Sequence, residues 1–74
     1  SVMTDKVNQQ RKIMRILQSG DSITTRQAFE MGILRLASRI SELRKIGYPI
    51  DDSWETKNGR SWKRYYWNED MQAA

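Results

Sequence analysis

Cysteine and histidine are both absent from the 74 residues of this chain. The absence of cysteine excludes a disulfide framework and thiolate chemistry, which fits a reducing cytoplasm. The absence of histidine removes the usual ligands of a zinc site and the commonest general base of enzymes. We therefore expect no catalytic residue, no metal site and no cofactor.

Long apolar runs are also missing. No stretch approaches the roughly 20 apolar residues of a membrane span, and the N-terminal region lacks the apolar core of a signal peptide. A chain of this length holds one compact core without a second domain. We expect a single domain over residues 4–67, flexible ends at 1–3 and 68–74, a cytoplasmic location and no membrane partner.

Positive charge is in excess, since 13 lysines and arginines against 9 aspartates and glutamates give a formal net charge of +4. This balance suits a polyanionic partner, although basic charge alone does not identify one. Three tryptophans, three tyrosines and four methionines add large apolar side chains. We expect the aromatic residues to supply much of the core.

Capping signals divide the first half of the chain into two helices. Thr4 or Asp5 can cap a helix that runs to about Ser19, where Gly20 ends it. Residues 21–23 follow as a short extended link.

A capping box begins the next helix, because Thr24 and Gln27 have the spacing at which each side chain satisfies a backbone donor of the other. This motif predicts a short helix from Thr25 to Met31, with Ala28 and Phe29 available to the core. The glycine directly after it supplies a tight turn.

A third helix, within the segment from Met31 to Ile50 and ending at Gly47, carries two stripes. At about 100° per residue, one arc holds the apolar or small residues Leu36, Ala37, Ile40 and Leu43. The opposite side, which we call the basic face, holds Arg35, Ser38, Arg39 and Glu42. The first stripe suits a core and the second suits a negatively charged partner.

The last part of the chain has the signals of a β-hairpin from Ile50 to Trp67. Asn58 and Gly59 form the dipeptide preferred in two-residue type I′ turns, and both flanks are rich in Trp, Tyr and Thr. We expect Ile50, Tyr65 and Trp67 to face the helices. The turn predicts the pairs Thr56 with Ser61, Trp54 with Lys63, Asp52 with Tyr65 and Ile50 with Trp67.

Three helices followed by a two-stranded β-hairpin wing make an α+β winged helix-turn-helix fold, whose third helix can enter the major groove of DNA. Arg35 and Arg39 can each donate two hydrogen bonds to a guanine edge, and Ser38 can donate or accept. Glu42 can accept from a cytosine amino group, or pair with Arg39 or Lys45 instead. The alternative is that this face is only the solvated side of a core helix.

Two further groups of residues can bind phosphates. The wing can follow the DNA backbone or enter the minor groove through Lys57, Asn58, Arg60 and Lys63, or its tip can simply be kept polar for solubility. Thr24, Thr25 and Arg26 open the second helix, whose free backbone donors can hold a phosphate. Capping alone explains Thr24 equally well.

Trp54 and Trp62 fall on opposite faces of the hairpin, so they are not expected to be buried together. An exposed indole can stack on a base, anchor a partner protein, or shield the core of the hairpin. A winged-helix adaptor that uses these tryptophans is therefore the main alternative to DNA binding. A mimic that occupies another protein's nucleic-acid channel is a weaker alternative because this chain is basic, and an enzyme ranks last.

Several of these residues recur in an order typical of one family: Ser22-Ile23-Thr24-Thr25, Ala28, Gly32-Ile33, Arg35-Leu36-Ala37-Ser38-Arg39-Ile40, Leu43-Arg44, Gly47-Tyr48-Pro49-Ile50, Lys57-Asn58-Gly59 and Arg64-Tyr65. The segment 22–67 thus resembles small winged helix-turn-helix proteins of phages and prophages. The resemblance implies DNA binding through the third helix and the wing, without catalysis, and a role in regulating or processing phage-type DNA. Leu34 departs from the pattern, because a Ser or Thr cap is usual there, and this leaves the start and the rotation of the third helix open.

We therefore expect a sequence-preferring protein that binds double-stranded DNA in a bacterial or phage-infected cell. It is either a transcriptional regulator or an excisionase-like architectural factor. One small domain offers few contacts, so tight binding also needs a second copy or another DNA-bound protein as a partner.

Overall fold

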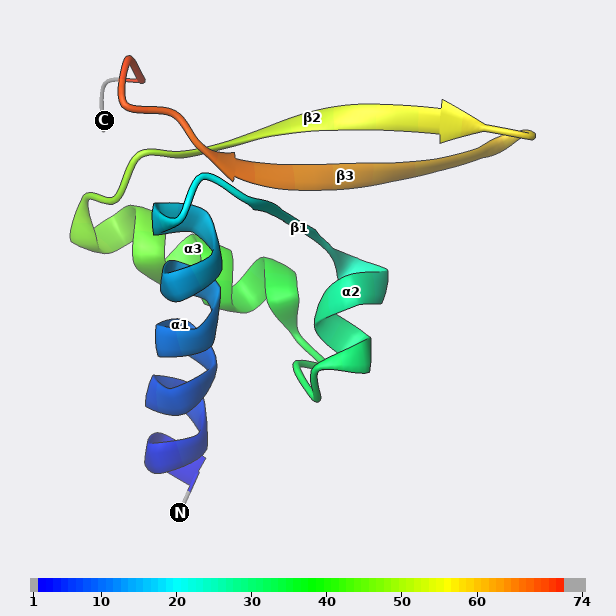
Figure 1. The fold of residues 1–74 in the computed structure, drawn as a ribbon. Helices are drawn as coiled ribbons and strands as arrows, with labels where there is room; N and C mark the ends of the chain where they lie inside the picture. The colour runs from blue at the N-terminus through cyan, green and yellow to red at the C-terminus, as the bar shows by residue number, and fades with distance from the viewer. Residues whose placement is uncertain (1, 72–74) are drawn as a thin grey trace.

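The computed structural model describes residues 2–71, and the side chains from residue 5 onward. Three helices pack beneath a three-stranded antiparallel sheet (Figure 1). The elements are α1 (Val2–Gln18), β1 (Ser22–Thr24), α2 (Thr25–Glu30), α3 (Leu36–Ile46), β2 (Ile50–Lys57) and β3 (Arg60–Trp67). The α+β winged helix-turn-helix fold predicted from the order of elements is confirmed.

The hairpin has the predicted register. Trp54 pairs with Lys63 and Ile50 with Trp67, and the two intermediate expected pairs are also formed. Asn58 and Gly59 both have positive φ angles, 53° and 77°, as a type I′ turn requires. The Asn58-Gly59 turn therefore predicted the strand pairing of the wing correctly.

The sheet contains a third strand within residues 21–23 and Thr24, where we expect only an extended link and a helix cap. Ser22–Thr24 forms β1 and pairs with β3, Ile23 lying opposite Tyr65, so the strand order is β1-β3-β2. The two-stranded wing is confirmed, and the expected extended link contributes an additional strand to its sheet. Three residues are too few to show an alternating pattern, and the strand forms because the edge of β3, about forty residues away in the chain, pairs with it.

The core draws on every element. Its buried residues are Ile13, Leu17, Ile23, Ala28, Ile33, Leu36, Ile40, Leu43, Ile50 and Tyr65. Two expected members are absent from it: Phe29 is 66% exposed, and Ala37 also lies at the surface. Because α2 has only six residues, it turns Ala28 alone into the core and leaves Phe29 outside.

The helix boundaries follow their local signals in most places. The capping box of α2 is confirmed, since Thr24 Oγ1 accepts from the Gln27 backbone at 3.2 Å and Gln27 Oε1 accepts from the Thr24 backbone at 3.0 Å. Gly47 ends α3 with a left-handed φ of 116°. The first helix begins at Val2, before the expected caps at Thr4 or Asp5.

The third helix begins later than the segment from Met31 suggested. Gly32 turns the chain with a φ of 85°, and α3 starts only at Leu36, after Arg35 in the N-cap position. No side-chain hydrogen bond caps this helix. Leu34, at the position where a Ser or Thr would be usual, is 69% exposed and outside the helix.

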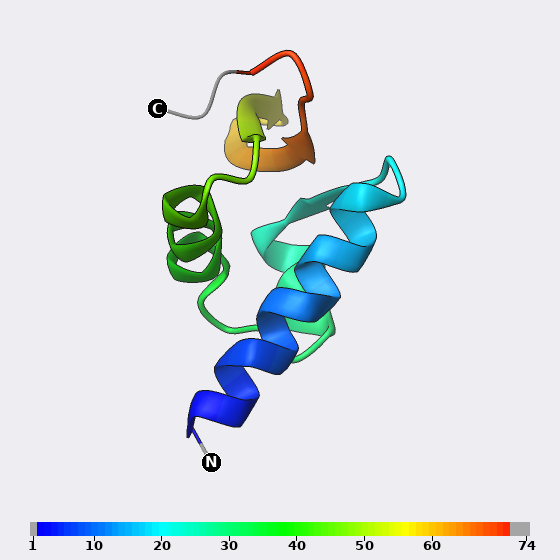
Figure 2. The ribbon, with the colours of Figure 1, turned by 90° about the vertical axis from the view of Figure 1, so that its left-hand side faces the viewer.

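Arg44 joins α3 to the base of the hairpin. Its Nε donates to the Ile50 carbonyl at 2.8 Å, and its Nη2 donates to Asp52 Oδ2 at 2.7 Å. The guanidinium also lies 5.7 Å from the centre of the Tyr65 ring. These contacts fix the orientation of the hairpin relative to α3. Figure 2, which looks along the hairpin, shows α1 and α3 below it on opposite sides.

The segment after β3 is attached to the sheet where we expected a flexible end. The Asn68 backbone donates to the Pro49 carbonyl at 2.9 Å, and its side chain donates to Asp51 Oδ2 at 3.1 Å. The structure thus continues regular contacts past Trp67. Val2 and Met3 belong to α1, whereas residues 1 and 72–74 of the expected flexible ends lie outside the described residues.

Candidate nucleic-acid interface

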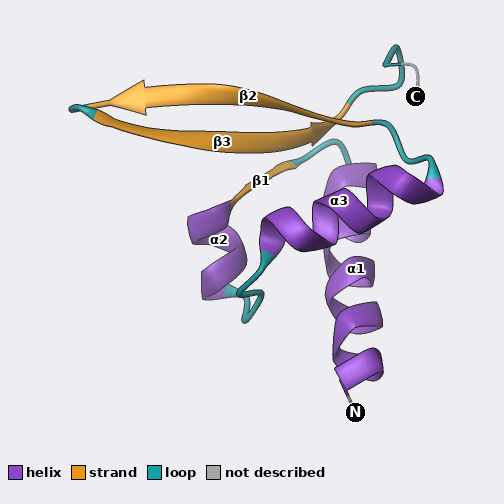
Figure 3. Cartoon of the chain, turned by 180° about the vertical axis from the view of Figure 1, so that it is seen from behind, coloured by secondary structure: helices purple, strands orange, loops and turns teal. Residues whose placement is uncertain are grey.

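The rotation of α3 is set by its buried stripe of Leu36, Ile40 and Leu43. The opposite, solvent-facing side consists of three short residues and one lysine: Ala37, Ser38, Ser41 and Lys45 are all exposed. In Figure 3, α3 lies in front of α1 and below the hairpin. Of these four residues, the sequence predicted only Ser38 as part of the DNA interface. The predicted basic face was centred nearer to Arg39.

Arg35 and Ser38 are the two members of the basic face that reach solvent freely. Both are exposed, and Arg35 forms no ion pair with any residue between 2 and 71. Arg35 stands at the N-cap of α3. In Figure 3 the hairpin tip extends past α2, whereas α3 begins closer to the middle of the molecule, so the start of α3 and the wing tip present separate positive charges.

Arg39 and Glu42 turn toward α1 instead. The Arg39 side chain is only 15% exposed, and its Nε lies 2.9 Å from Glu42 Oε1. This ion pair does not have the geometry of a hydrogen bond, so Arg39 Nε has no hydrogen-bond partner among the described residues. Of the uses foreseen for Glu42, pairing with Arg39 is the one observed in the free protein.

Glu42 also holds two residues of α1. Its Oε2 lies 2.6 Å from Lys6 Nζ, and its Oε1 accepts from Gln10 Nε2 at 3.1 Å. The hydrogen bond from Lys6, aided by Gln10 and by the Arg39 charge, lowers the pKa of Glu42 below its usual range despite some burial. The basic face is therefore divided into an open part, Arg35 and Ser38, and a part that is tied to α1.

The wing carries its cations at the tip. Lys57, Asn58 and Arg60 are exposed on and beside the turn. Lys63 is half-buried, and its ammonium lies 5.4 Å from the centre of the Trp54 ring, which is within cation–π distance. Trp54 itself is 66% exposed. The tip thus presents positive charge next to an open aromatic face.

The residues that open α2 have different surroundings. Thr24 is 6% exposed and its hydroxyl accepts the capping hydrogen bond, so its side chain serves the helix. Thr25 and Arg26 are exposed, and Arg26 Nε lies 3.7 Å from Glu30 Oε1, a loose pair at the surface. Only Thr25 and Arg26 of this group have side chains available to a ligand.

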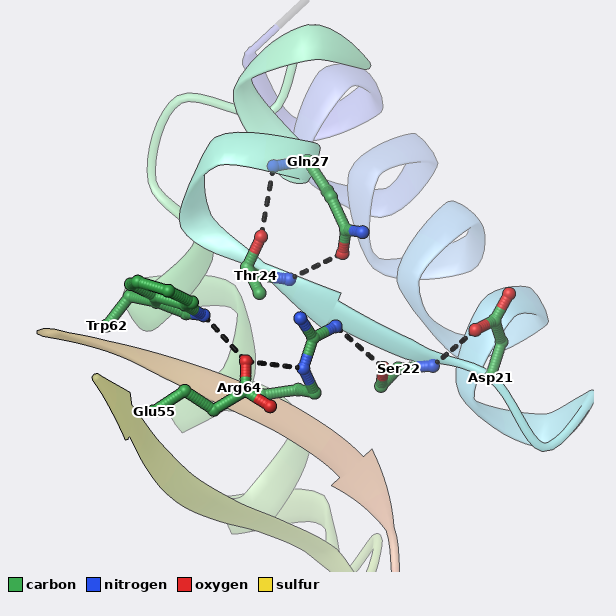
Figure 4. Close-up of polar contacts among 7 residues, drawn as sticks. All are labelled: Asp21, Ser22, Thr24, Gln27, Glu55, Trp62 and Arg64. Carbon is green, nitrogen blue, oxygen red and sulfur yellow. Dashed lines mark hydrogen bonds and ion pairs between the residues drawn. The ribbon is translucent and has the colours of Figure 1, made fainter. Parts of the chain in front are cut away.

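A polar network stabilises the sheet (Figure 4). Glu55 Oε1 accepts from Trp62 Nε1 at 2.7 Å and from Arg64 Nε at 3.0 Å, and Arg64 Nη1 donates to Ser22 Oγ at 3.0 Å. The network therefore joins all three strands. Trp62 is half-buried in it, so the two hairpin tryptophans differ in availability.

Comparisons with known proteins place this geometry in a family. A family model described as "Winged helix-turn-helix domain" matches residues 8–67. No curated protein and no solved structure matches the chain. None of the helices within residues 2–71 combines the length and the hydropathy needed to cross a membrane. Winged helix-turn-helix domains are typically DNA-binding modules without enzymatic activity.

Proposed function

The chain belongs to the winged helix-turn-helix domain family, and on this basis we propose that it binds double-stranded DNA with α3 in the major groove. The observation that carries the proposal is the open side of α3. Ser38 and Ser41 are short, so the helix backbone can approach base edges closely, and Lys45 and Arg35 supply positive charge at its two ends. The net charge of +4 supports a polyanionic partner.

The open and tied parts of the basic face suggest different roles. Arg35 reads a guanine edge, with Ser38 assisting as a short donor or acceptor. Arg39 reaches a base or a phosphate only by leaving Glu42, so its pairing with Glu42 competes with DNA. Glu42 chiefly positions Arg39 and Lys6 in the free protein.

The wing and the start of α2 supply phosphate contacts. Arg60, Lys57 and Asn58 lie on the backbone or in the minor groove, and Lys63 supports them from the strand behind. Thr25 and Arg26 contact a phosphate from α2, whereas Thr24 acts there by capping the helix. This distribution gives α3 the sequence-reading contacts and the wing the sequence-independent ones.

The finer assignment is a phage- or prophage-type DNA-binding factor of the cytoplasm. It acts as a transcriptional regulator or as an excisionase-like architectural factor. Because a single domain of this size buries little DNA surface, a second copy or another DNA-bound protein supplies the remaining affinity.

Selection of binders from random duplex DNA by the full chain, at near-physiological salt, tests this function. We expect a short motif to be enriched and its binding to survive at salt concentrations that remove random duplexes. A pool without any enriched sequence, bound only at low salt, would contradict sequence-preferring binding.

The second candidate function is a winged-helix protein adaptor, and it is favoured by the 66% exposure of Trp54. Tryptophan is enriched among the residues that dominate protein interfaces. The selection from random duplex DNA, together with partner binding by a Trp54→Ser variant, distinguishes the two functions. If the folded chain enriches no duplex and a defined protein partner is lost on Trp54→Ser, the adaptor replaces our proposal.

A further inference from the structure

A cleft of about 560 Å³ separates α2 from the wing, and no residue of α3 lines it. One wall comes from α2 through Arg26, Gln27 and Glu30. The other wall comes from β3 through Arg60, Ser61 and Trp62. The cleft is therefore bounded by a helix on one side and by the edge of a strand on the other.

That strand edge is unpaired where it meets the cleft. β1 pairs with β3 only as far as Thr24 opposite Arg64, whereas β3 itself continues to Arg60. Counted from the two-residue turn, the ladder closes at Lys57 and Arg60, so Ser61 and Lys63 direct their backbone N–H and C=O groups away from β2. An exposed row of alternating donors and acceptors is a template for another strand.

Trp62 gives this wall a fixed shape. Its indole N–H donates to Glu55 at 2.7 Å, and Glu55 is held in turn by Arg64, as Figure 4 shows. The ring therefore keeps its position beside the free edge. An apolar side chain of an entering segment can pack against it without a rearrangement of the wing.

The charges at the two walls favour an acidic occupant. Arg26, with its side chain 88% exposed, and the exposed Arg60 stand on opposite walls. Glu30 is the single acid among the lining residues and already lies 3.7 Å from Arg26. Three arginines line the cleft against this one acid, and although Arg64 is paired with Glu55, Arg26 and Arg60 leave the cleft net positive.

We propose that an extended acidic segment of a partner protein binds in this cleft and adds a fourth strand to β3. Its backbone supplies a donor and an acceptor to Ser61 and an acceptor to the Lys63 N–H, whereas a DNA backbone has only acceptors and leaves the Ser61 carbonyl unsatisfied. Its carboxylates meet Arg26 and Arg60, and its apolar side chains meet Trp62. The inference does not rest on the proposed DNA binding. No residue of α3 takes part, but Arg26, Arg60 and Lys63 are also the proposed phosphate contacts, so the acidic segment and DNA compete for these three residues.

An NMR titration of the ¹⁵N-labelled full chain tests the proposal, with a capped hexapeptide of alternating glutamate and valine as the probe. We expect the amide signals of Ser61, Trp62 and Lys63 and of α2 to shift together. Arg26→Glu should weaken peptide binding about fivefold to tenfold through lost attraction and new repulsion. Arg15→Glu, an equal charge change at an exposed position of α1, should leave binding unchanged.

A second variant removes a backbone donor instead of a charge. Ser61→Pro deletes the N–H that the added strand needs, and proline is tolerated at a strand edge whose N–H faces outward. We expect it to abolish binding. Arg26→Glu remains informative if Ser61→Pro unfolds the domain, because an acid in the first turn of α2 favours the helix and offsets the new repulsion from Glu30.

Three results would overturn the proposal. The first is equal binding of a lysine–valine hexapeptide, which removes the charge argument. The second is a shift of the same amides by a short DNA duplex but not by the peptide, which assigns the cleft to nucleic acid. The third is the same shift on raising the concentration of the chain alone, which assigns the cleft to a second copy.

Discussion

Lys6 Nζ lies 2.6 Å from Glu42 Oε2, so the first turns of α1 are tied to the middle of α3. The same carboxylate has Arg39 Nε at 2.9 Å and accepts from the Gln10 side chain. One acid thus balances two cations of its own chain. In the free protein Glu42 organises the positive charge near α3 rather than facing solvent as a separate contact.

Glu42→Gln should destabilise the domain in a pH-dependent way. The folded-state pKa of Glu42 is lowered from its ordinary 4.5, chiefly by the hydrogen bond from Lys6. Its stabilising contribution is therefore fully present above pH 4.5 and is lost as the pH falls through the lowered folded value. Chemical denaturation from pH 3 to pH 7 should show a difference between wild type and variant at neutral pH that shrinks in acid.

Glu69→Gln is the matched control for this series, because Glu69 is exposed and forms no ion pair within residues 2–71. It should match the wild type at each pH. A Glu42→Gln difference that stays constant from pH 7 to pH 3 would show that the glutamine acts through packing and not through the lost charge.

Arg35→Ala should reduce both affinity and specificity for the selected DNA site. If Arg35 donates two hydrogen bonds to a guanine, its loss costs about 1–3 kcal/mol of binding free energy and relaxes the preference at one base pair. Competition binding on the selected site and on its single-base variants measures both effects. An equal loss on all these duplexes would make Arg35 a phosphate contact.

Arg60→Ala should change the salt dependence of DNA binding. An arginine at the wing tip that neutralises one phosphate contributes about one to the slope of log affinity against log salt. Titrations of the selected duplex between low and physiological salt should therefore give a shallower slope for the variant. Arg15→Ala is the control on α1, and equal slopes for the two variants would remove the wing from the interface.

Thr24→Ala should affect folding and not DNA recognition. Loss of the hydroxyl that accepts from the Gln27 backbone costs about 1 kcal/mol of the free energy of unfolding. Thr25→Ala, at the exposed neighbouring position, should change stability by less than about 0.5 kcal/mol. Denaturant unfolding of both variants decides this, and a Thr24→Ala protein of normal stability with weakened DNA binding would assign the hydroxyl to a phosphate.

Much of the secondary structure was predictable because its signals are local. Thr24 and Gln27 are three residues apart, so the capping box is readable before any tertiary contact forms. Asn58 and Gly59 set the register of the whole hairpin in the same way. Phe29 shows the limit of this reasoning, since its direction depends on how the short α2 sits against the other helices.

The candidate interface was less predictable because it depends on rotation and on distant neighbours. Because Leu34 is not a capping residue, the sequence did not show where α3 begins. In the structure, burial of Leu36, Ile40 and Leu43 leaves Ser41 and Lys45 on the open side of the helix. Glu42 and its partners in α1 are 32 or more residues apart in the chain, and the periodicity of a sequence does not predict contacts at that separation.

By itself, the sequence determined the fold class, the glycine-terminated helices, the wing and its pairing, since each rests on the conformational preference of a few adjacent residues. Only the tertiary structure decided that Ser22–Thr24 is a strand, that β3 keeps a free edge beside α2, and that Arg39 and Glu42 turn to α1 while Arg35 stays open. These features arise where segments far apart in the chain meet, and local propensity carries no information about such meetings.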